Sequence, residues 1–189
     1  MLEELLHLDK ELFLFLNNLG TGRWDVFWLF MTNKWTWIPL YALLLFLAFR
    51  QLGPRKTVLL LIAIALLITC TDQLANFFKA GAQRLRPCYD PEVNELMRLV
   101  NPYCGGKYGY YSAHASNSFA IAIFFTRVLR SKFRYLPILI MTWAIMVSYS
   151  RVYIGVHFPL DILTGMGTGL IMGWLFSKLY IFALNKYHV

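Results

Sequence analysis

The 189-residue sequence is poor in charge, since only 15% of its residues are Asp, Glu, Lys or Arg. A soluble globular domain carries about 25%. It also lacks internal repeats and low-complexity segments. Apolar residues make up 58% of the chain and aromatic residues 17%, and the mean hydropathy is +0.51. These values exclude a disordered chain, a collagen-like repeat and an ordinary soluble enzyme.

Acidic residues are the scarcer charged class, with 10 Asp and Glu against 18 Lys and Arg and a net charge of +8. In a soluble protein this excess would indicate a nucleic-acid partner. In so apolar a chain, basic residues are instead expected in cytoplasmic loops. We therefore expect membrane lipids, and no nucleic acid, as partners.

The N-terminus lacks the basic stretch and the small-residue cleavage site of a secretory signal peptide. Apolar residues recur at helical spacing over residues 2–19, with acidic residues between them. This pattern predicts an amphipathic helix in the membrane interface. The apolar run 24–30 is too short to span a bilayer and is expected near the interface or re-entering it. Residues 1–33 thus form a predicted N-terminal interfacial segment.

Five apolar runs follow, each able to cross a hydrocarbon core of about 30 Å when its interfacial ends are counted. They cover residues 35–49, 57–78, 112–128, 135–150 and 159–184. The third has a polar start. The predicted fold is all-α: a polytopic membrane helix bundle of about five transmembrane helices plus the N-terminal amphipathic helix, in a single integral-membrane domain over residues 1–189.

Two connections, residues 50–56 and 130–134, are short and basic and contain no acid. The positive-inside rule makes them cytoplasmic. The N-terminal helix, the long outer loop 80–111 and residues 151–158 then share the other side. On this topology nine of the 18 Lys and Arg and none of the acids face the inside, toward anionic lipid. We expect a multi-pass protein of the inner (cytoplasmic) membrane. His7 and His188 are expected at the surface.

Only three cysteines occur. Cys70 lies within the second run and is expected to pack as a small apolar residue. Cys88 and Cys104 flank the outer loop, where an oxidising compartment would permit a disulfide worth about 3 kcal/mol; two free thiols are the alternative. A zinc site would need further Cys or His nearby, and the sequence has none there.

Ionisable and small polar residues gather at the predicted outer ends of four spans, where their cost points to function. These are Lys79, Arg84, Arg86, Ser112, His114, Arg151, His157 and Asp161. Ser112 is suited to cap a helix whose following amides would bind an anion. Asp161 lies four residues after His157 and can orient its imidazole. Two histidines, one backed by a carboxylate, beside an Arg/Lys clamp suit phosphoryl transfer.

Several of these residues have plainer interpretations when taken singly. His157 and Asp161 would also make a buried hydrogen-bonded pair, and Lys79 would also end a span in the headgroup region. Arg84 is expected to contact headgroups or solvent. Asp72 is expected to pair with a cation or to cap a polar pocket. For Ser116 and Asn117, lining the site and packing helices are equal alternatives. A further set is expected to pack within the loop, with framing of the site entrance as the alternative: Lys107, Tyr108, Tyr110 and Tyr111.

The ordered set resembles the type-2 phosphatidic acid phosphatase superfamily of membrane lipid phosphatases, whose signature is K-x6-R-P, P-S-G-H and S-R-x5-H-x3-D. The first part matches from Lys79 to Pro87, and the third from Ser150 to Asp161. The second part has Tyr111 for Pro and Ala113 for Gly. Gly would let the backbone approach a phosphate more closely than Ala. The resemblance covers residues 57–173, the predicted core.

The resemblance implies a role for each matched residue. His157 would be the nucleophile that forms a phosphohistidine, oriented by Asp161, and His114 would be the general acid. The phosphate would be bound by Lys79, Arg86, Ser112, the Ala113 amide and Arg151. No metal or other cofactor is implied.

The small chain is similar to bacterial undecaprenyl-diphosphate phosphatases of this superfamily. The resemblance therefore implies hydrolysis of a lipid phosphate or diphosphate at a periplasmic active site, with undecaprenyl diphosphate as the first expectation. Phosphatidylglycerophosphate, phosphatidic acid and lipid A are the alternative substrates. A non-enzymatic transporter or scaffold is the alternative from another class, although a transporter would be expected to show a repeat. Vanadate-dependent haloperoxidases share the signature but are soluble. The sequence leaves the oligomeric state open.

Overall fold

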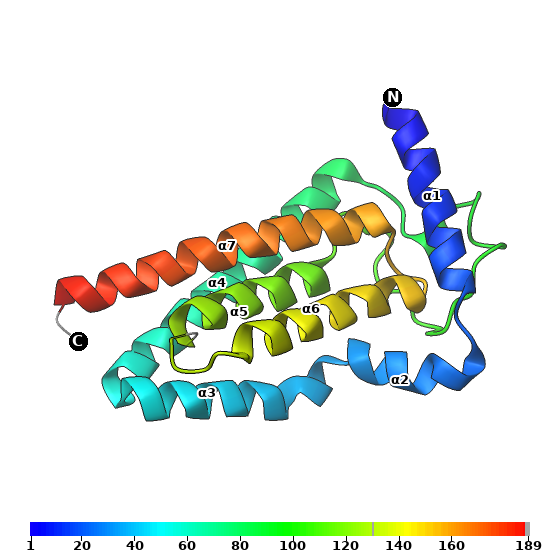
Figure 1. Ribbon diagram of the computed structural model, residues 1–189. Coiled ribbons are helices and arrows are strands. Elements are labelled where there is room, and N and C mark those ends of the chain that lie inside the picture. Colours follow the sequence, from blue (N-terminus) through cyan, green and yellow to red (C-terminus); the bar gives the residue numbers. More distant parts are fainter. Residues whose placement is uncertain (130, 188–189) are drawn as a thin grey trace.

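The computed structural model describes residues 1–129 and 131–187 (Figure 1). Within these residues the chain is helical, with no β-strand. Its α-helices are α1 (Leu2–Asn18), α2 (Gly22–Thr32), α3 (Ile38–Leu52), α4 (Pro54–Ala82), α5 (Ala113–Leu129), α6 (Leu136–Tyr153) and α7 (Pro159–Tyr187). The predicted all-α bundle is confirmed. The predictions for Arg130 and His188 lie outside the described residues.

Four segments of the described chain are long and apolar enough to cross a membrane. They are Lys34–Leu52, Pro54–Ala82, Leu136–Tyr153 and Pro159–Lys186. These segments correspond to the first, second, fourth and fifth predicted runs. The third run forms α5, which has 17 residues and is the most enclosed of the bundle helices. It packs against α4, α6 and α7. Its polar start is therefore sheltered by neighbouring helices rather than exposed to lipid.

Small residues let α5 and α7 approach closely. A Cβ added at Gly169 of α7 would lie only 2.3 Å from the carbonyl oxygen of Ser116 on α5. Two further α7 glycines, each four residues away, meet the α5 backbone at 2.4–2.5 Å in the same way. The three are Gly165, Gly169 and Gly173. Glycines at this spacing form a seam between helices in membrane bundles. The seam fixes the register of the two helices.

The outer ends of α4, α5, α6 and α7 meet at one end of the bundle, and α1 crosses that end (Figure 1). Asp9, Phe13 and Asn17 form the buried face of α1. Asn17 donates hydrogen bonds to the carbonyl oxygens of Val152 and Tyr153 at 3.1 and 2.9 Å. The other face exposes large apolar side chains: Leu2, Leu5, Leu8, Leu12, Phe15 and Leu19. The predicted amphipathic helix is thus present, with its polar contacts turned to the bundle.

The outer loop begins after Ala82, where Gln83 ends α4 in a left-handed conformation with φ of 46°. A disulfide joins Cys88 to Cys104 within it, whereas Cys70 is free and partly buried. Backbone pairing of Leu85 with Tyr108 brings the two sides of the loop together. The loop is thereby held folded against the bundle end.

Candidate active site

The start of α5 forms one wall of the site. The buried Ser112 hydroxyl accepts a hydrogen bond from the Ala115 amide at 3.4 Å, which caps the helix. The Ser112 amide donates to the carbonyl oxygen of Asp161 at 3.0 Å, which ties α5 to α7. The first amides of an α-helix have no carbonyl partner within the helix. The Ala113 and His114 amides are therefore suited to bind an anion.

His157 lies at the centre of the cluster and is 2% exposed. Its Nε2 lies 3.0 Å from Nη1 of Arg86, and its Nδ1 lies 3.3 Å from Oδ2 of Asp161. A guanidinium can only donate hydrogen bonds. Nε2 therefore carries the lone pair, and Nδ1 carries the proton shared with Asp161.

Burial lowers the pKa of His157 well below its usual value of 6.5, and the nearby cations Arg86, Arg151 and Lys79 lower it further. A lowered pKa keeps the imidazole neutral, with its Nε2 lone pair available, at neutral pH. The same interactions bring three predicted phosphate-binding residues together around the ring.

Arg86 is almost fully buried and is held by the outer loop. Its Nε donates to the carbonyl oxygen of Gly106 at 2.7 Å, and its Nη1 donates to that of Val156 at 3.0 Å. Burial lowers its pKa, but a guanidinium remains charged. The disulfide partner Cys104 lies two residues before Gly106. The bridge therefore supports the carbonyl that orients Arg86.

Arg151 and Lys79 complete the cationic wall. Arg151 donates through Nη1 to the Thr32 hydroxyl, while its buried Nε has no partner among the described residues. A bound phosphate oxygen would satisfy such an N–H group. Lys79 lies in the last turn of α4. Among residues 1–129 and 131–187, no three His, Cys, Asp or Glu side chains gather as metal ligands do.

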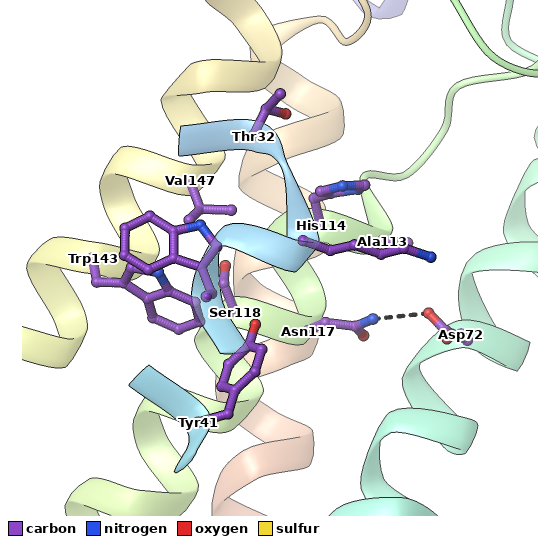
Figure 2. A pocket seen from close by; sticks show the side chains of 11 residues that line it. Thr32, Tyr41, Asp72, Ala113, His114, Asn117, Ser118, Trp143 and Val147 are labelled. Carbon is purple, nitrogen blue, oxygen red and sulfur yellow. Dashed lines mark hydrogen bonds between the residues drawn. The ribbon is translucent and has the colours of Figure 1, made fainter. Parts of the chain in front are cut away.

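A cavity of about 260 Å³ opens beside His114 (Figure 2). One side of it is aromatic, formed by Trp37, Tyr41 and Trp143. The other side is polar and includes Asp72 and Asn117. His114 also lies within electrostatic range of His157 and Arg151. His114 thus lies near the cationic cluster, and the cavity lies on the His114 side.

The polar side of the cavity settles two open alternatives. Asp72 accepts a hydrogen bond from Asn117 at 2.9 Å (Figure 2), and Asn117 accepts one from the Thr71 hydroxyl at 2.6 Å. Asp72 therefore caps a polar pocket, and Asn117 lines it. Ser116 instead faces Gly169 in the helix seam. Tyr111 is fully buried and donates to the Thr71 carbonyl oxygen at 3.3 Å.

The prediction for Arg84 is wrong. Its side chain is 15% exposed and pairs with two carboxylates, Asp161 at 3.0 Å and Asp9. Arg84 faces inward because its backbone is paired across the outer loop. The Gly109 amide donates to the Arg84 carbonyl oxygen at 2.9 Å, and the guanidinium then points toward the bundle.

Asp9 was also absent from the predicted site residues. In the sequence, Asp9, Phe13 and Asn17 follow one another at four-residue spacing, which places them on one face of α1. The structure shows that this face is buried. A carboxylate on such a face requires a charged partner.

Comparison with known proteins places these observations in a family. Residues 56–184 match the PAP2 superfamily. A lipid A 4'-phosphatase of Porphyromonas gingivalis is 35% identical over 98% of this chain and 78% of its own. A lipid A 4'-phosphatase of Bacteroides thetaiotaomicron is 39% identical over 93% of this chain and 78% of its own. An undecaprenyl-diphosphatase of Sulfolobus acidocaldarius is 30% identical over 92% of this chain and 77% of its own.

Solved structures agree with this match. The crystal structure of Aquifex aeolicus LpxE has a TM-score of 0.65 and 27% identity, covering 89% of this chain and 93% of that one. The crystal structure of a transmembrane PAP2-type phosphatidylglycerolphosphate phosphatase of Bacillus subtilis has a TM-score of 0.72, covering 93% of this chain and 86% of that one. Its identity of 18% supports the fold alone. The predicted resemblance is confirmed: the chain belongs to the PAP2 superfamily and is a multi-pass membrane phosphatase acting on phosphoric esters.

Proposed function

We propose that the protein removes a phosphate monoester from the sugar headgroup of a lipid of the lipid A type. The identity of 35–39% to two lipid A 4'-phosphatases, against 30% to an undecaprenyl-diphosphatase, supports this substrate. Lipid A was the alternative in the sequence-based prediction. It is better supported than undecaprenyl diphosphate, the first expectation.

The cavity beside His114 is the observation that favours lipid A over undecaprenyl diphosphate, because the leaving group of the reaction would lie there. Its aromatic side suits the apolar face of a sugar ring, and Asp72 and Asn117 on the other side suit hydroxyl and amide groups. A diphosphate would instead place a second phosphate near the Asp72 carboxylate, where like charges repel. Lys34 also lines the cavity, but its ammonium lies over the Trp35 ring at 5.2 Å.

The lipid part of the substrate has an adjoining apolar site. A second cavity of about 440 Å³ is lined by side chains of α3, α4 and α5. It shares Tyr41 and Asn117 with the first cavity and is otherwise lined by Leu, Ile and Phe. An acyl chain in this second cavity would leave the phosphate at the cationic cluster. The arrangement supports entry of the lipid from the side of the bundle.

The reaction follows from the two histidines. Nε2 of His157 attacks phosphorus, the bond from phosphorus to the sugar oxygen breaks, and His114 protonates that oxygen. Arg86 moves its hydrogen bond from Nε2 to a phosphate oxygen. Water, deprotonated by His114, then attacks the phosphohistidine and releases inorganic phosphate. The cations and the first α5 amides stabilise the charge on the transferring group.

The active site is proposed to face the periplasm. The outer ends of α4 to α7 lie opposite the connections α3–α4 and α5–α6, whose basic residues favour the cytoplasm. The substrate headgroup would therefore lie in the outer leaflet of the inner membrane.

A substrate panel tests the function. The purified protein is given lipid A, undecaprenyl diphosphate, phosphatidylglycerophosphate and phosphatidic acid in one detergent, with EDTA present, and phosphate release is measured. We expect the highest kcat/KM with lipid A. We expect a loss on the order of 10³-fold or more in a His157→Ala variant that still inserts and folds. A higher kcat/KM with undecaprenyl diphosphate would refute the substrate, and an active His157→Ala variant would refute the mechanism.

A further inference from the structure

Asp9 of the interfacial helix α1 lies behind the pair of His157 and Asp161, and its side chain is 2% exposed. Nothing in the phosphatase motifs includes this residue. We propose that Asp9 is a positioning residue of the active site, acting through Arg84 to hold Asp161 against His157. The inference rests on the proposed function in one respect, since it takes His157 as the nucleophile.

The first link is the guanidinium of Arg84, which lies between two buried carboxylates. Its Nη2 donates to Oδ2 of Asp9, and its Nη1 donates to Oδ1 of Asp161 at 3.0 Å. The other oxygen of Asp161, Oδ2, faces His157 at 3.3 Å and accepts a hydrogen bond from the Phe158 amide at 3.0 Å. Arg84 therefore fixes the rotation of the catalytic carboxylate together with the Phe158 amide, and Asp9 fixes Arg84.

The second link runs through the backbone. Oδ1 of Asp9 accepts a hydrogen bond from the amide of Leu160 at 2.8 Å. Leu160 directly precedes Asp161 in the first turn of α7. Asp9 thus holds Asp161 in two ways. It acts on the Asp161 side chain through Arg84, and on the Asp161 backbone through the first turn of α7. The Arg84 guanidinium also lies 4.4 Å from the centre of the Phe158 ring, which closes the network beside His157.

The charges of this network bear on the chemical step. Two carboxylates and one guanidinium leave a net negative charge behind the imidazole. Positive charge develops on His157 as its nitrogen bonds to phosphorus, and a fixed negative charge behind the ring stabilises that state. Without Asp9, Arg84 would neutralise Asp161, and this stabilisation would be reduced. The effect concerns the chemical step more than substrate binding, because the phosphate contacts lie on the opposite side of the ring.

The test compares two changes on one helix, each of which replaces a charged side chain by an amide. Asp9→Asn retains an acceptor for the Leu160 amide but removes the ion pair with Arg84. We expect kcat to fall about tenfold to a hundredfold, as for other groups that orient a catalytic side chain, and KM to change less than about twofold. Lys10→Gln is the matched control. It breaks the α1 ion pairs with Asp90 and Glu92 at 2.9 and 3.0 Å, which do not touch Asp161.

Four further measurements separate positioning from folding. The rate of phosphohistidine formation should fall with kcat in Asp9→Asn, while the melting temperature stays near that of Lys10→Gln. In an Asp161→Asn background, Asp9→Asn should cause little further loss, because the two act through one network. Arg84→Lys, which keeps a charge but cannot bridge both carboxylates, should reproduce the loss if Asp9→Asn does not fold.

Wild-type kcat in a folded Asp9→Asn variant would overturn the inference, and so would an equal loss of kcat in Lys10→Gln. Either result beside an inactive His157→Ala variant would leave the proposed function standing. Full turnover by His157→Ala would overturn both.

Discussion

The chemistry of the site depends on which nitrogen of His157 is free. Asp161 accepts a hydrogen bond from the protonated Nδ1, and Arg86, which can only donate, contacts the lone pair of Nε2. On the proposed mechanism, substrate phosphate replaces Arg86 at Nε2. Arg86 would then bind the transferring group after contacting the attacking nitrogen in the free enzyme.

The pH dependence of the reaction should show the environment of His157. Its pKa lies well below 6.5 because burial and the neighbouring cations disfavour the charged ring. Protonation of Nε2 removes the nucleophile, so activity is lost only as the pH falls through this lowered pKa. We expect the acid limb of kcat/KM, measured between roughly pH 4 and 8, to have its midpoint below 6.5. A midpoint at or above 6.5 would contradict the buried, cation-flanked imidazole.

Asp72 should govern the choice of leaving group. In Asp72→Asn the charge is lost but the size is kept, so hydrogen bonds to a sugar weaken and repulsion of a second phosphate disappears. We expect kcat/KM for lipid A to fall about tenfold to a hundredfold, the value of one charged hydrogen bond of about 1.5–3 kcal/mol. The ratio of undecaprenyl diphosphate to lipid A turnover should rise. Equal losses for both substrates would show that Asp72 acts on folding instead.

Residues were predictable where the relevant partners are close in sequence. The spacing of His157 and Asp161 is four residues, and it indicated their contact directly. The pair of Arg84 and Asp9 is separated by 75 residues, so only the packing of α1 on the bundle end brings them together. The four-residue spacing of Asp9, Phe13 and Asn17 is visible in the sequence, but neither the burial of this row nor the cation that pairs with Asp9 could be predicted from it.

At the scale of elements, the charged residues that separate the apolar runs predicted where the helices begin and end. Arg50 and the basic connection after it separate the first two runs, and the structure turns there at Gly53, directly before Pro54 begins α4. The apolar pattern did not indicate which of the helices is the most deeply buried. α5 is central because its seam with α7 admits close approach, which depends on glycines 53 residues further along the chain than the backbone groups they meet.

That seam predicts a steric effect. A Cβ at Gly169 would meet the Ser116 backbone at 2.3 Å, whereas one at Gly167, half a turn away, would meet nothing within 4 Å. We expect Gly169→Ala to destabilise the protein by about 1–3 kcal/mol, as for other overpacked sites, and to reduce activity by shifting Ser112 relative to Asp161. Gly167→Ala is the control and should leave both unchanged. Thermal unfolding in detergent with a parallel phosphate assay measures both, and equal behaviour of the two variants would contradict the seam.

At the scale of the molecule, one end of the bundle is covalently reinforced. The Cys88–Cys104 bridge closes the loop that carries Arg86 and its acceptor Gly106. Replacing both cysteines by serine should cost about 3 kcal/mol in stability and raise KM, because Arg86 is less well held. A reductant should have the same effect on the wild type and none on the double variant, with melting temperature as the readout. Insensitivity of the wild type to the reductant would contradict a role for the bridge.

The fold class and the family were predictable from the whole chain, because hydropathy and three ordered motifs are global patterns. The substrate was not, since the motifs bind phosphate and leave the rest of the lipid unspecified. The cavity proposed to distinguish a sugar from a second phosphate takes its walls from Tyr41 on α3, Asp72 on α4 and Trp143 on α6. No local spacing connects these residues.

The close seam of α5 and α7 has a mechanical consequence. Ser112 and Asp161 lie at the starts of helices that cannot slide past one another, so on the proposed mechanism the phosphate-binding amides and the carboxylate behind His157 move together. The facing wall of the cavity combines Trp143 and Val147 of α6 with the chain between Thr32 and Tyr41, which includes the junction of α2 with α3. For the glycolipid substrate proposed above, widening of the cavity would therefore require this wall to move while the pair of α5 and α7 stays fixed.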